Sequence, residues 1–152
     1  MRASRRRWLP AVAVALAAGT VLGAGQLIGH SAPSSAASDM LGPGDVTVTL
    51  TIHHSHFDLS TIHVAPGTTV RFVVDNQDPI NHELIVGDAE VQRIHELGTE
   101  AVHPPRPGEV SVPALTTAET TFYFADPGSV MYACHLPGHF RYGMSGYVDV
   151  GT

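Results

Sequence analysis

The sequence predicts an all-β domain, a β-sandwich of about seven or eight short strands with one short helix. Short segments rich in Val, Ile, Thr, Phe and Tyr recur from residue 46 to residue 150, and several of them alternate apolar with polar positions. Turn-forming residues separate these segments, with 15 Gly and 11 Pro among 152 residues. Short strands with frequent turns are typical of a sandwich.

The first 44 residues differ from the rest of the chain. Basic residues at positions 2–7 precede an apolar stretch from Leu9 to about residue 24, which is the layout of a secretory signal, and the Ser4–Leu9 run resembles a twin-arginine signal. We expect an export signal or an N-terminal anchor over residues 1–28. Cleavage and a membrane tether both stay open, because an apolar stretch of about 16–20 residues is borderline for crossing a bilayer. Residues 29–44, rich in Ser, Ala, Pro and Gly, are expected to form a flexible linker to a domain at 45–152.

The first three predicted strands lie before residue 80. Residues 46–52 alternate Val, Leu and Ile with Thr, as in a strand with one buried face. Residues 62–64 form a second short strand that ends at the turn Pro66-Gly67. Residues 69–75 are apolar and β-branched, which favours a third strand, and residues 76–79 break it.

A fourth strand and the helix follow. Residues 84–86 are Leu, Ile and Val, and Gly87 ends the run. Within residues 88–97, Val91, Ile94 and Leu97 recur at three-residue spacing, so they are expected to form the apolar face of a short helix. Asp88 is the predicted N-cap, Gly98 the stop, and a Pro-rich loop comes next.

The last three predicted strands cover residues 120–124, 130–134 and 147–150. The first alternates Thr with aromatic residues, and the turn Asp126-Pro127-Gly128 leads to the second. The third closes the domain with Tyr and Val residues.

The predicted domain is acidic. From residue 38 onward the chain has four Arg against 14 Asp and Glu, a formal charge of −10, and it has no Lys. Such a body repels phosphate backbones and anionic lipid, so nucleic acid is excluded as a partner and a basic protein surface is favoured. Cys134 is the single cysteine, so an intrachain disulfide is impossible.

Three side chains with metal-binding chemistry stand five residues apart between two predicted strands. Cys134, His139 and Met144 offer a thiolate, an imidazole and a thioether. These groups form the ligand set of a mononuclear blue-copper site, which also needs a second His. His82 lies at the start of a distant predicted strand, where such a ligand is expected. The residues therefore predict one copper ion held by His82, Cys134, His139 and Met144.

The Cys-x4-His-x4-Met loop, together with the segment Asn81-His82-Glu83-Leu84, resembles the cupredoxin superfamily, which includes plastocyanin, azurin and rusticyanin. The spacings are similar to those of rusticyanin and of the mononuclear site of multicopper oxidases, whereas plastocyanin has fewer residues between Cys and His. The resemblance covers roughly residues 45–152. It implies a Greek-key sandwich with one type 1 copper ion.

Four other histidines lie in or beside the first predicted strands: His53, His54, His56 and His63. Neighbouring side chains of an extended chain point to opposite faces, so His53 and His54 are not expected to point together. We expect these residues to face solvent. A looser second metal site at His54 and His56 is the alternative.

His135 is expected to point away from the copper, because its neighbour Cys134 points toward it. A surface position is favoured, with an electron exit beside the thiolate as the alternative. Multicopper oxidases bind a trinuclear copper cluster through a His at this position, but the paired His-x-His motifs that complete that cluster are missing here. His95 and His103 are expected to be exposed, and Asn81 to hydrogen-bond to the ligand loop.

These expectations indicate a one-electron carrier outside the cytoplasm rather than an enzyme, since four protein ligands leave no position for a substrate. The resemblance implies that the edge of His139 is the transfer port. The expected partners are redox proteins with a basic docking face, and the chain is expected to be monomeric. The alternative is an extracytoplasmic copper carrier or buffer, which the histidines at positions 53, 54 and 56 support.

Overall fold

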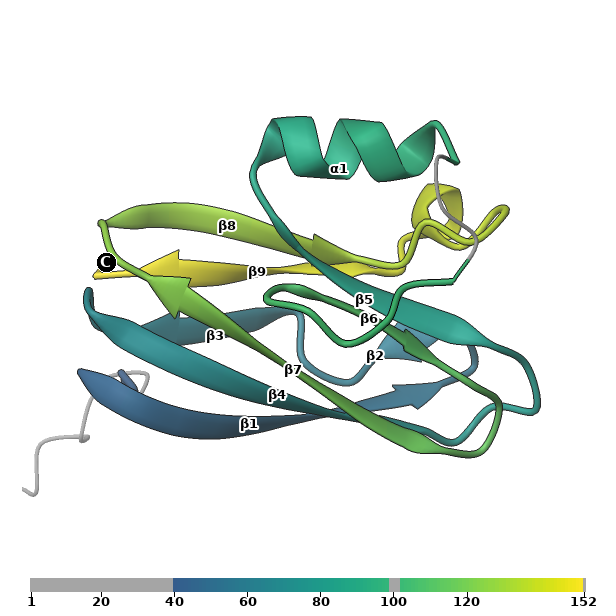
Figure 1. Ribbon diagram of the computed structural model, residues 1–152, viewed down its shortest axis with the longest axis horizontal. Helices are drawn as coiled ribbons and strands as arrows, with labels where there is room; N and C mark the ends of the chain where they lie inside the picture. Colours follow the sequence, from purple (N-terminus) through teal and green to yellow (C-terminus); the bar gives the residue numbers. More distant parts are fainter. Residues whose placement is uncertain (1–39, 99–101, 152) are drawn as a thin grey trace, which may run out of the picture. The chain divides into compact units, whose positions relative to one another are not determined.

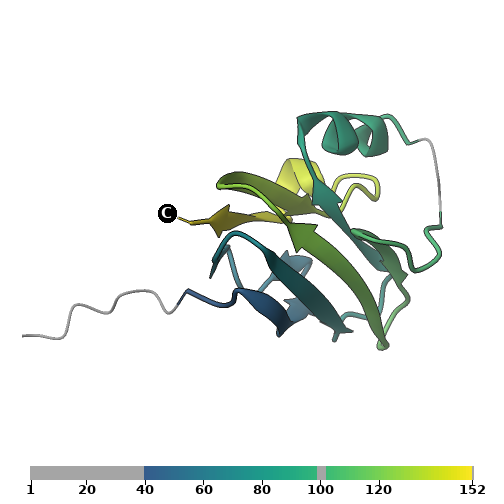
Figure 2. The same ribbon diagram turned by 60° about the vertical axis from the view of Figure 1, so that its left-hand side comes forward.

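Two sheets packed face to face form the domain in a computed structural model, which describes residues 40–98 and 102–151 (Figures 1 and 2). The four-stranded sheet has the order β2 (His56–Phe57), β1 (Gly44–His53), β4 (Thr68–Asn76) and β7 (Thr117–Phe124). The five-stranded sheet has the order β3 (Thr61–Val64), β9 (Ser145–Val150), β8 (Gly128–Ala133), β5 (His82–Gly87) and β6 (Glu109–Val112). The predicted all-β sandwich is confirmed.

All seven predicted strands are present, and the described residues contain two more, β2 and β6. The alternation of residues 46–52 predicted one buried face for the first strand, and Val48, Leu50 and Ile52 of β1 are buried. The two extra strands have two and four residues. They are too short for an alternating pattern to stand out in the sequence.

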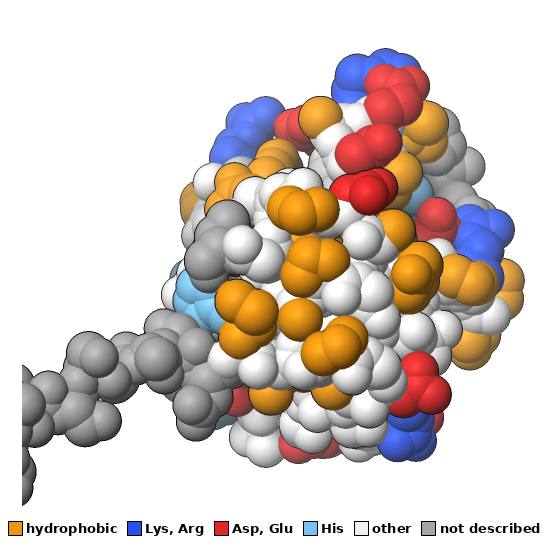
Figure 3. Space-filling model, turned by 90° about the vertical axis from the view of Figure 1, so that its left-hand side faces the viewer, with side chains coloured by type: hydrophobic (Ala, Val, Ile, Leu, Met, Phe, Trp, Pro, Cys, Tyr) orange, Lys and Arg blue, Asp and Glu red, His pale blue; other side chains and the backbone are white. Residues whose placement is uncertain are grey.

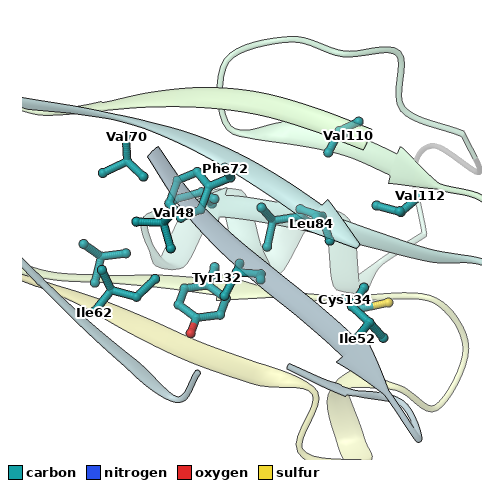
Figure 4. Close-up of a cluster of buried hydrophobic side chains, with 14 of the residues drawn as sticks. Val48, Ile52, Ile62, Val70, Phe72, Leu84, Val110, Val112, Tyr132 and Cys134 are labelled. Carbon is teal, nitrogen blue, oxygen red and sulfur yellow. The ribbon is translucent and has the colours of Figure 1, made fainter. Parts of the chain in front are cut away.

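The hydrophobic core lies between the two sheets (Figure 4). Phe72 of β4 is fully buried and packs edge-on against Phe124 of β7, with ring centroids 6.5 Å apart. Cys134 lies at one end of this cluster, beyond Leu84 and Tyr132 (Figure 4). The cluster thus continues directly into the loop that carries the predicted metal ligands.

Strand β5 is buried along its whole length. It is hydrogen-bonded between β6 and β8, and helix α1 (Ala89–Glu96) packs against it (Figure 1). Side chains of a strand alternate between the two faces of a sheet. Leu84 therefore points into the sandwich core, whereas Glu83 points to the opposite face and is still buried.

Helix α1 has the predicted ends, but its regularly spaced apolar residues do not form its buried face. The Asp88 carboxylate accepts hydrogen bonds from the backbone N–H groups of Glu90 and Val91, both at 3.0 Å, so Asp88 is the N-cap. Ile94 and Leu97 are exposed, and the buried residue is Gln92. The Nε2 of Gln92 donates to three carbonyl oxygens, those of Ile85, Gly87 and Met131, at 3.1–3.3 Å. The sheet offers these carbonyl oxygens beneath α1, and the amide of Gln92 pairs with them as an apolar side chain could not.

Replacing Gln92 by alanine should lower the free energy of unfolding by about 1–3 kcal/mol, because buried carbonyl groups lose their donor. Chemical denaturation measures this change. Gln77→Ala is the matched control, since Gln77 is exposed and its amide donates to the half-buried carboxylate of Asp75. Equal stabilities of the two variants would show that the Gln92 amide does not hold the helix on the sheet.

The end of the domain at which β8 begins and β9 finishes is drawn in Figure 3. Acidic and basic side chains stand at its margins, the upper group over α1, and hydrophobic and uncharged side chains lie between them. Within the described residues, no helix is long and apolar enough to span a bilayer.

Candidate metal centre

The loop between β8 and β9 folds back on itself through backbone hydrogen bonds. The N–H of His139 donates to Leu136 O at 2.9 Å, the N–H of Met144 to His139 O at 3.1 Å, and the N–H of Cys134 to Met144 O at 3.1 Å. Gly138 and Gly143 have φ angles of +90° and +94°, which side-chain-bearing residues rarely adopt. The two glycines thus allow the turns that bring Cys134, His139 and Met144 to one end of the core.

His82 and the β8–β9 loop meet around one sulfur atom. The Sγ of Cys134 lies 4.0 Å from Nδ1 of His82 and 3.2 Å from Nδ1 of His139. One ligand atom from each of the three residues lies within 4.8 Å of the others. Cys134 and His82 are buried and His139 is half-buried. This arrangement leaves one edge of the group, that of His139, partly open to solvent.

Asp78 sets the orientation of His82. Burial raises the pKa of Asp78, but hydrogen bonds from the backbone of Ser55 and His54 and from the His82 ring outweigh it and hold that pKa below its ordinary value. An ionised carboxylate only accepts hydrogen bonds, so His82 Nε2 donates to Asp78 Oδ2, at 3.1 Å. In a neutral ring the lone pair is then on Nδ1, which faces the sulfur.

The protonation of His82 also suits a metal ligand. Burial lowers its pKa, and the nearby charge of His139 acts in the same direction, against the raising effect of Asp78. The ring is therefore neutral near pH 7, as ligation requires.

Cys134 needs a cation to become an anion. Burial raises the pKa of its thiol to about 12, although backbone N–H groups of Leu136 and Glu83 act to lower it. A thiolate forms here when a bound cation compensates its charge. One thiolate and two imidazoles at this spacing fit copper, which prefers sulfur and nitrogen donors.

A comparison with known families supports the same metal. The sequence model of copper-binding proteins of the plastocyanin/azurin family matches residues 44–151. The chain belongs to this family. It is a cupredoxin, and copper is its cofactor. The resemblance noted in the sequence is confirmed.

Curated relatives of this cupredoxin are described as copper-resistant cuproproteins CopI. The Rubrivivax gelatinosus protein is 39% identical over 97 residues, which cover 62% of this chain and 59% of that protein. The Pseudomonas aeruginosa protein is 26% identical over 185 residues, covering 95% of this chain and 97% of that protein. The Vibrio cholerae protein is 33% identical over 86 residues, about half of either chain. The chain thus spans about three fifths of the first of these relatives.

Solved structures agree with the fold. Auracyanin B has a TM-score of 0.59 and 22% identity, with 74% of this chain and 92% of that chain covered. Auracyanin A from Chloroflexus aurantiacus, a blue copper protein, has a TM-score of 0.56 and 24% identity, with 71% and 100% covered. At this identity the likeness establishes the cupredoxin fold alone.

The structure brings three of the four predicted ligands of this cupredoxin together, and Met144 ends the same loop. Its side chain is fully buried in the core cluster that contains Cys134. Its backbone bonds both other ligands of the loop, Cys134 through the carbonyl group and His139 through the N–H group. Met144 therefore lies beside Cys134 and His139 along the backbone, with its side chain in the same core cluster as Cys134.

The expectation for Asn81 is wrong. Its side-chain oxygen accepts a hydrogen bond from the backbone N–H of Ala114, at 3.0 Å, in the β6–β7 loop rather than in the ligand loop. The ligand loop is instead held by Glu83, whose Oε1 accepts from the N–H of His135 at 2.7 Å. The sequence carried a signal for this role of Glu83, since an acidic residue stands directly before the apolar run of residues 84–86. A carboxylate in a buried strand needs hydrogen-bond partners, which here include the ligand loop.

The expectations for three other histidines are also corrected. His103 is buried, and the side chain of His95 is only 8% exposed. His135 points away from Cys134 as predicted, but it is half-buried rather than exposed, and its Nε2 lies 2.7 Å from Oε1 of Gln92. Helix α1 and the loop after it cover this face of the sheet, and the local sequence does not reveal that cover.

The histidines of the β1–β2 hairpin behave differently from the prediction in one respect. His53, His54 and His56 are exposed as expected, but the rings of His53 and His54 lie together, with centroids 3.9 Å apart. His54 and Ser55 have φ angles of +52° and +57°, and this tight turn ends the alternation of the strand. Within the described residues, the groups of potential metal ligands do not include these three histidines.

Proposed function

We propose that this cupredoxin holds one copper ion in a type 1 site formed by His82, Cys134, His139 and Met144, and that it carries single electrons between protein partners outside the cytoplasm. The observation that carries the proposal is the buried thiol of Cys134, which lies 4.0 Å and 3.2 Å from the Nδ1 atoms of two imidazoles. Bound copper would supply a one-electron couple between one and two positive charges.

Residues that do not bind the metal hold the ligands in place, which suits a site that changes its charge by one electron. Asp78 fixes the ring of His82, and the backbone bonds of the loop fix Cys134 and His139. Side chains that are already positioned move little when the charge of the site changes, so the reorganisation that opposes electron transfer is small. The core around Cys134 excludes water and favours the lower charge, which raises the reduction potential.

His139 is the proposed exit for the electron, because its ring is half-buried while His82 and Cys134 are buried. Ile80 and Leu115 expose apolar side chains in two loops that meet beside Asp78, where the N–H of Leu115 donates to Asp78 O at 3.1 Å. Exposed apolar side chains beside Asp78, the residue that holds His82, offer a partner an uncharged contact surface like the centre of a protein interface. We propose a redox protein with a basic docking face, which the acidic charge of the domain would attract.

The proposal includes the layout of the whole chain. Residues 1–28 would act as an export signal or a membrane tether and residues 29–44 as a linker, and of these two segments only residues 40–44 are among the described residues. The domain over 45–152 would act as a monomer outside the cytoplasm. We propose no catalytic role, since four protein ligands leave no position for a substrate.

A second candidate function is copper handling, as a carrier or buffer that limits free copper. The relatives described as copper-resistant cuproproteins support it. The two functions differ in how firmly the ion must be kept, because a carrier of copper releases its cargo and a carrier of electrons does not.

Redox titration of the copper-loaded protein, combined with exchange against a copper chelator, separates the two functions. Electron transfer predicts a reversible one-electron couple and metal loss that is slow compared with reduction and oxidation. Rapid transfer of the ion to the chelator, or an irreversible couple, would favour copper handling and overturn the first proposal.

Replacing Met144 by leucine should leave copper bound and raise the reduction potential by tens of millivolts. For a one-electron couple, about 59 mV corresponds to a tenfold change in equilibrium constant. The reason is that the variant removes a weak donor that favours the higher charge, at nearly constant volume. Spectroelectrochemistry measures the potential. Met131→Leu is the control, because Met131 lies on β8 three residues before Cys134 and faces away from the core. Equal potentials of the two variants would contradict an axial role for Met144.

A further inference from the structure

A layer of polar side chains lies under α1, on the face of the five-stranded sheet opposite Cys134. His95 comes from the helix, His103 from the loop after it, and Glu109 from the start of β6. One ligand atom from each of these three residues lies within 4.8 Å of the others. Their side chains are 8%, 1% and 19% exposed, so three groups that could bind a metal meet where solvent is mostly excluded.

The ring of His95 is oriented for ligation. Its Nδ1 lies 2.7 Å from the carbonyl oxygen of Val91, and because a carbonyl only accepts, Nδ1 carries the hydrogen. In a neutral ring the lone pair is then on Nε2, which faces Oε2 of Glu109 at 3.5 Å. Two electron-rich atoms face each other favourably only when a proton or a cation lies between them.

His103 is held in the same manner. Its backbone forms two hydrogen bonds with Ser111 of β6, one to the hydroxyl at 2.8 Å and one from the N–H of Ser111 at 3.1 Å. Its Nε2 lies 3.4 Å from Oε2 of the buried Glu83, and its Nδ1 lies 3.4 Å from Oε2 of Glu109. A carboxylate behind the far nitrogen of a histidine is the usual support of a metal-binding ring.

Glu109 supplies a negative charge. Burial raises its pKa, but the hydrogen bond and positive charge of Arg106, with the neighbouring His95 and His103 acting in the same direction, outweigh burial and hold that pKa below its ordinary value. The carboxylate is therefore anionic near pH 7. Together the three side chains offer two imidazole nitrogens and one carboxylate oxygen, the ligand set of three-residue zinc sites and a suitable set for Cu²⁺.

Solvent reaches one of the three residues, and the guanidinium of Arg106 competes with a metal ion for the other two. A surface hollow of about 460 Å³ is lined by Glu83, His95, His135 and Leu136, so an ion can reach His95 from solvent. The guanidinium of Arg106 bonds Oε2 of Glu109 at 2.6 Å through Nε and lies 3.4 Å from Nδ1 of His103. Its side chain is 44% exposed. An entering divalent cation would displace this guanidinium toward solvent, so Arg106 acts as a competitor.

We propose that His95, His103 and Glu109 form a second metal site, for a divalent transition-metal ion such as Zn²⁺ or Cu²⁺, separate from the His82–Cys134–His139 centre. The bound ion would occupy the space beside the Glu109 carboxylate that the guanidinium of Arg106 now fills. Because it is on the opposite face of the sheet from Cys134, it remains available when the first centre is filled.

Zn²⁺ binding to the copper-loaded full chain, measured by isothermal titration calorimetry, tests the proposal. The wild-type protein should bind one Zn²⁺, His95→Gln should weaken that binding at least about tenfold, and Arg106→Gln should tighten it. His56→Gln is the control on the exposed hairpin and should leave the binding unchanged. The visible copper absorption of each variant reports that the domain is folded.

His103→Gln is a second loss variant, and His95→Gln stands in for it if the buried change at residue 103 prevents folding. Absence of Zn²⁺ binding in both the wild-type protein and Arg106→Gln would overturn the proposal and leave an ion-pair network in its place. Binding that His56→Gln removes and His95→Gln preserves would also overturn it, because the ion would then be on the hairpin.

Discussion

Cys134→Ser should abolish the intense visible absorption of the copper-loaded protein and greatly weaken copper binding. The absorption of such a centre comes from charge transfer between a thiolate and Cu²⁺, and Cys134 is the only thiol in the chain. A serine hydroxyl in the same buried position is a poor ligand because it stays protonated near pH 7. Absorption spectroscopy during copper addition measures the first effect, and competition with a copper chelator measures the second.

Ala133→Ser is the matched control for this variant. It introduces the same hydroxyl one residue earlier, on the opposite face of β8, and should keep the absorption band. An intense band that survives in Cys134→Ser would contradict the proposed centre. Loss of the band in both variants would show that an added hydroxyl perturbs the fold. Chemical denaturation of the two apoproteins would then show whether Cys134→Ser is folded and lacks only the ligand.

Asp78→Ala should lower copper affinity by about 10–100-fold, the usual cost of removing the partner behind a metal-binding histidine. The carboxylate of Asp78 accepts from Nε2 of His82 at 3.1 Å and from the backbone N–H groups of His54 and Ser55 at 2.8 and 2.7 Å. It thus holds the ligand ring and ties the β1–β2 hairpin to the β4–β5 loop. Without it, the ring of His82 can rotate and its tautomer is no longer fixed.

The same variant should also destabilise the apoprotein by about 1.5–3 kcal/mol or more, because hydrogen bonds to a charged group are lost. Asp58→Ala is the control, since Asp58 accepts from the N–H of Thr51 at 2.9 Å on the same hairpin but is exposed and does not contact His82. Chelator competition and chemical denaturation measure the two effects. Wild-type copper affinity in Asp78→Ala would show that the carboxylate does not position His82.

Much of the fold was predictable because it depends on local patterns. The alternation over residues 46–52 predicts which side chains of β1 are buried, and Asp88 predicts where α1 begins. The apolar spacing of α1 predicted the helix but not its buried face, since Ile94 and Leu97 are exposed and Gln92 is buried. Helical spacing describes only the helix itself, whereas the face that becomes buried depends on the sheet beneath it, which here offers carbonyl groups.

The candidate centre divides in the same way. The spacing of Cys134, His139 and Met144 on one loop, with His82 before a strand, pointed to copper, and the family comparison confirms copper as the cofactor. Pro-Gly-His and Gly-Met supply the glycines that the turns of this loop require. The partners of these residues were not predictable, because Asp78 reaches His82 only after the β4–β5 loop has folded against the hairpin.

By itself, the sequence determined the class of the fold and the chemistry of the metal, because strand alternation and the kinds of side chain on one loop are local properties. The tertiary structure alone decided which polar groups are buried. Asp78 lies behind His82, and Glu83, His95, His103 and Glu109 are enclosed between α1 and the five-stranded sheet. The physical reason is that burial of a polar side chain depends on what covers it, and here the cover comes from elements far apart in the chain.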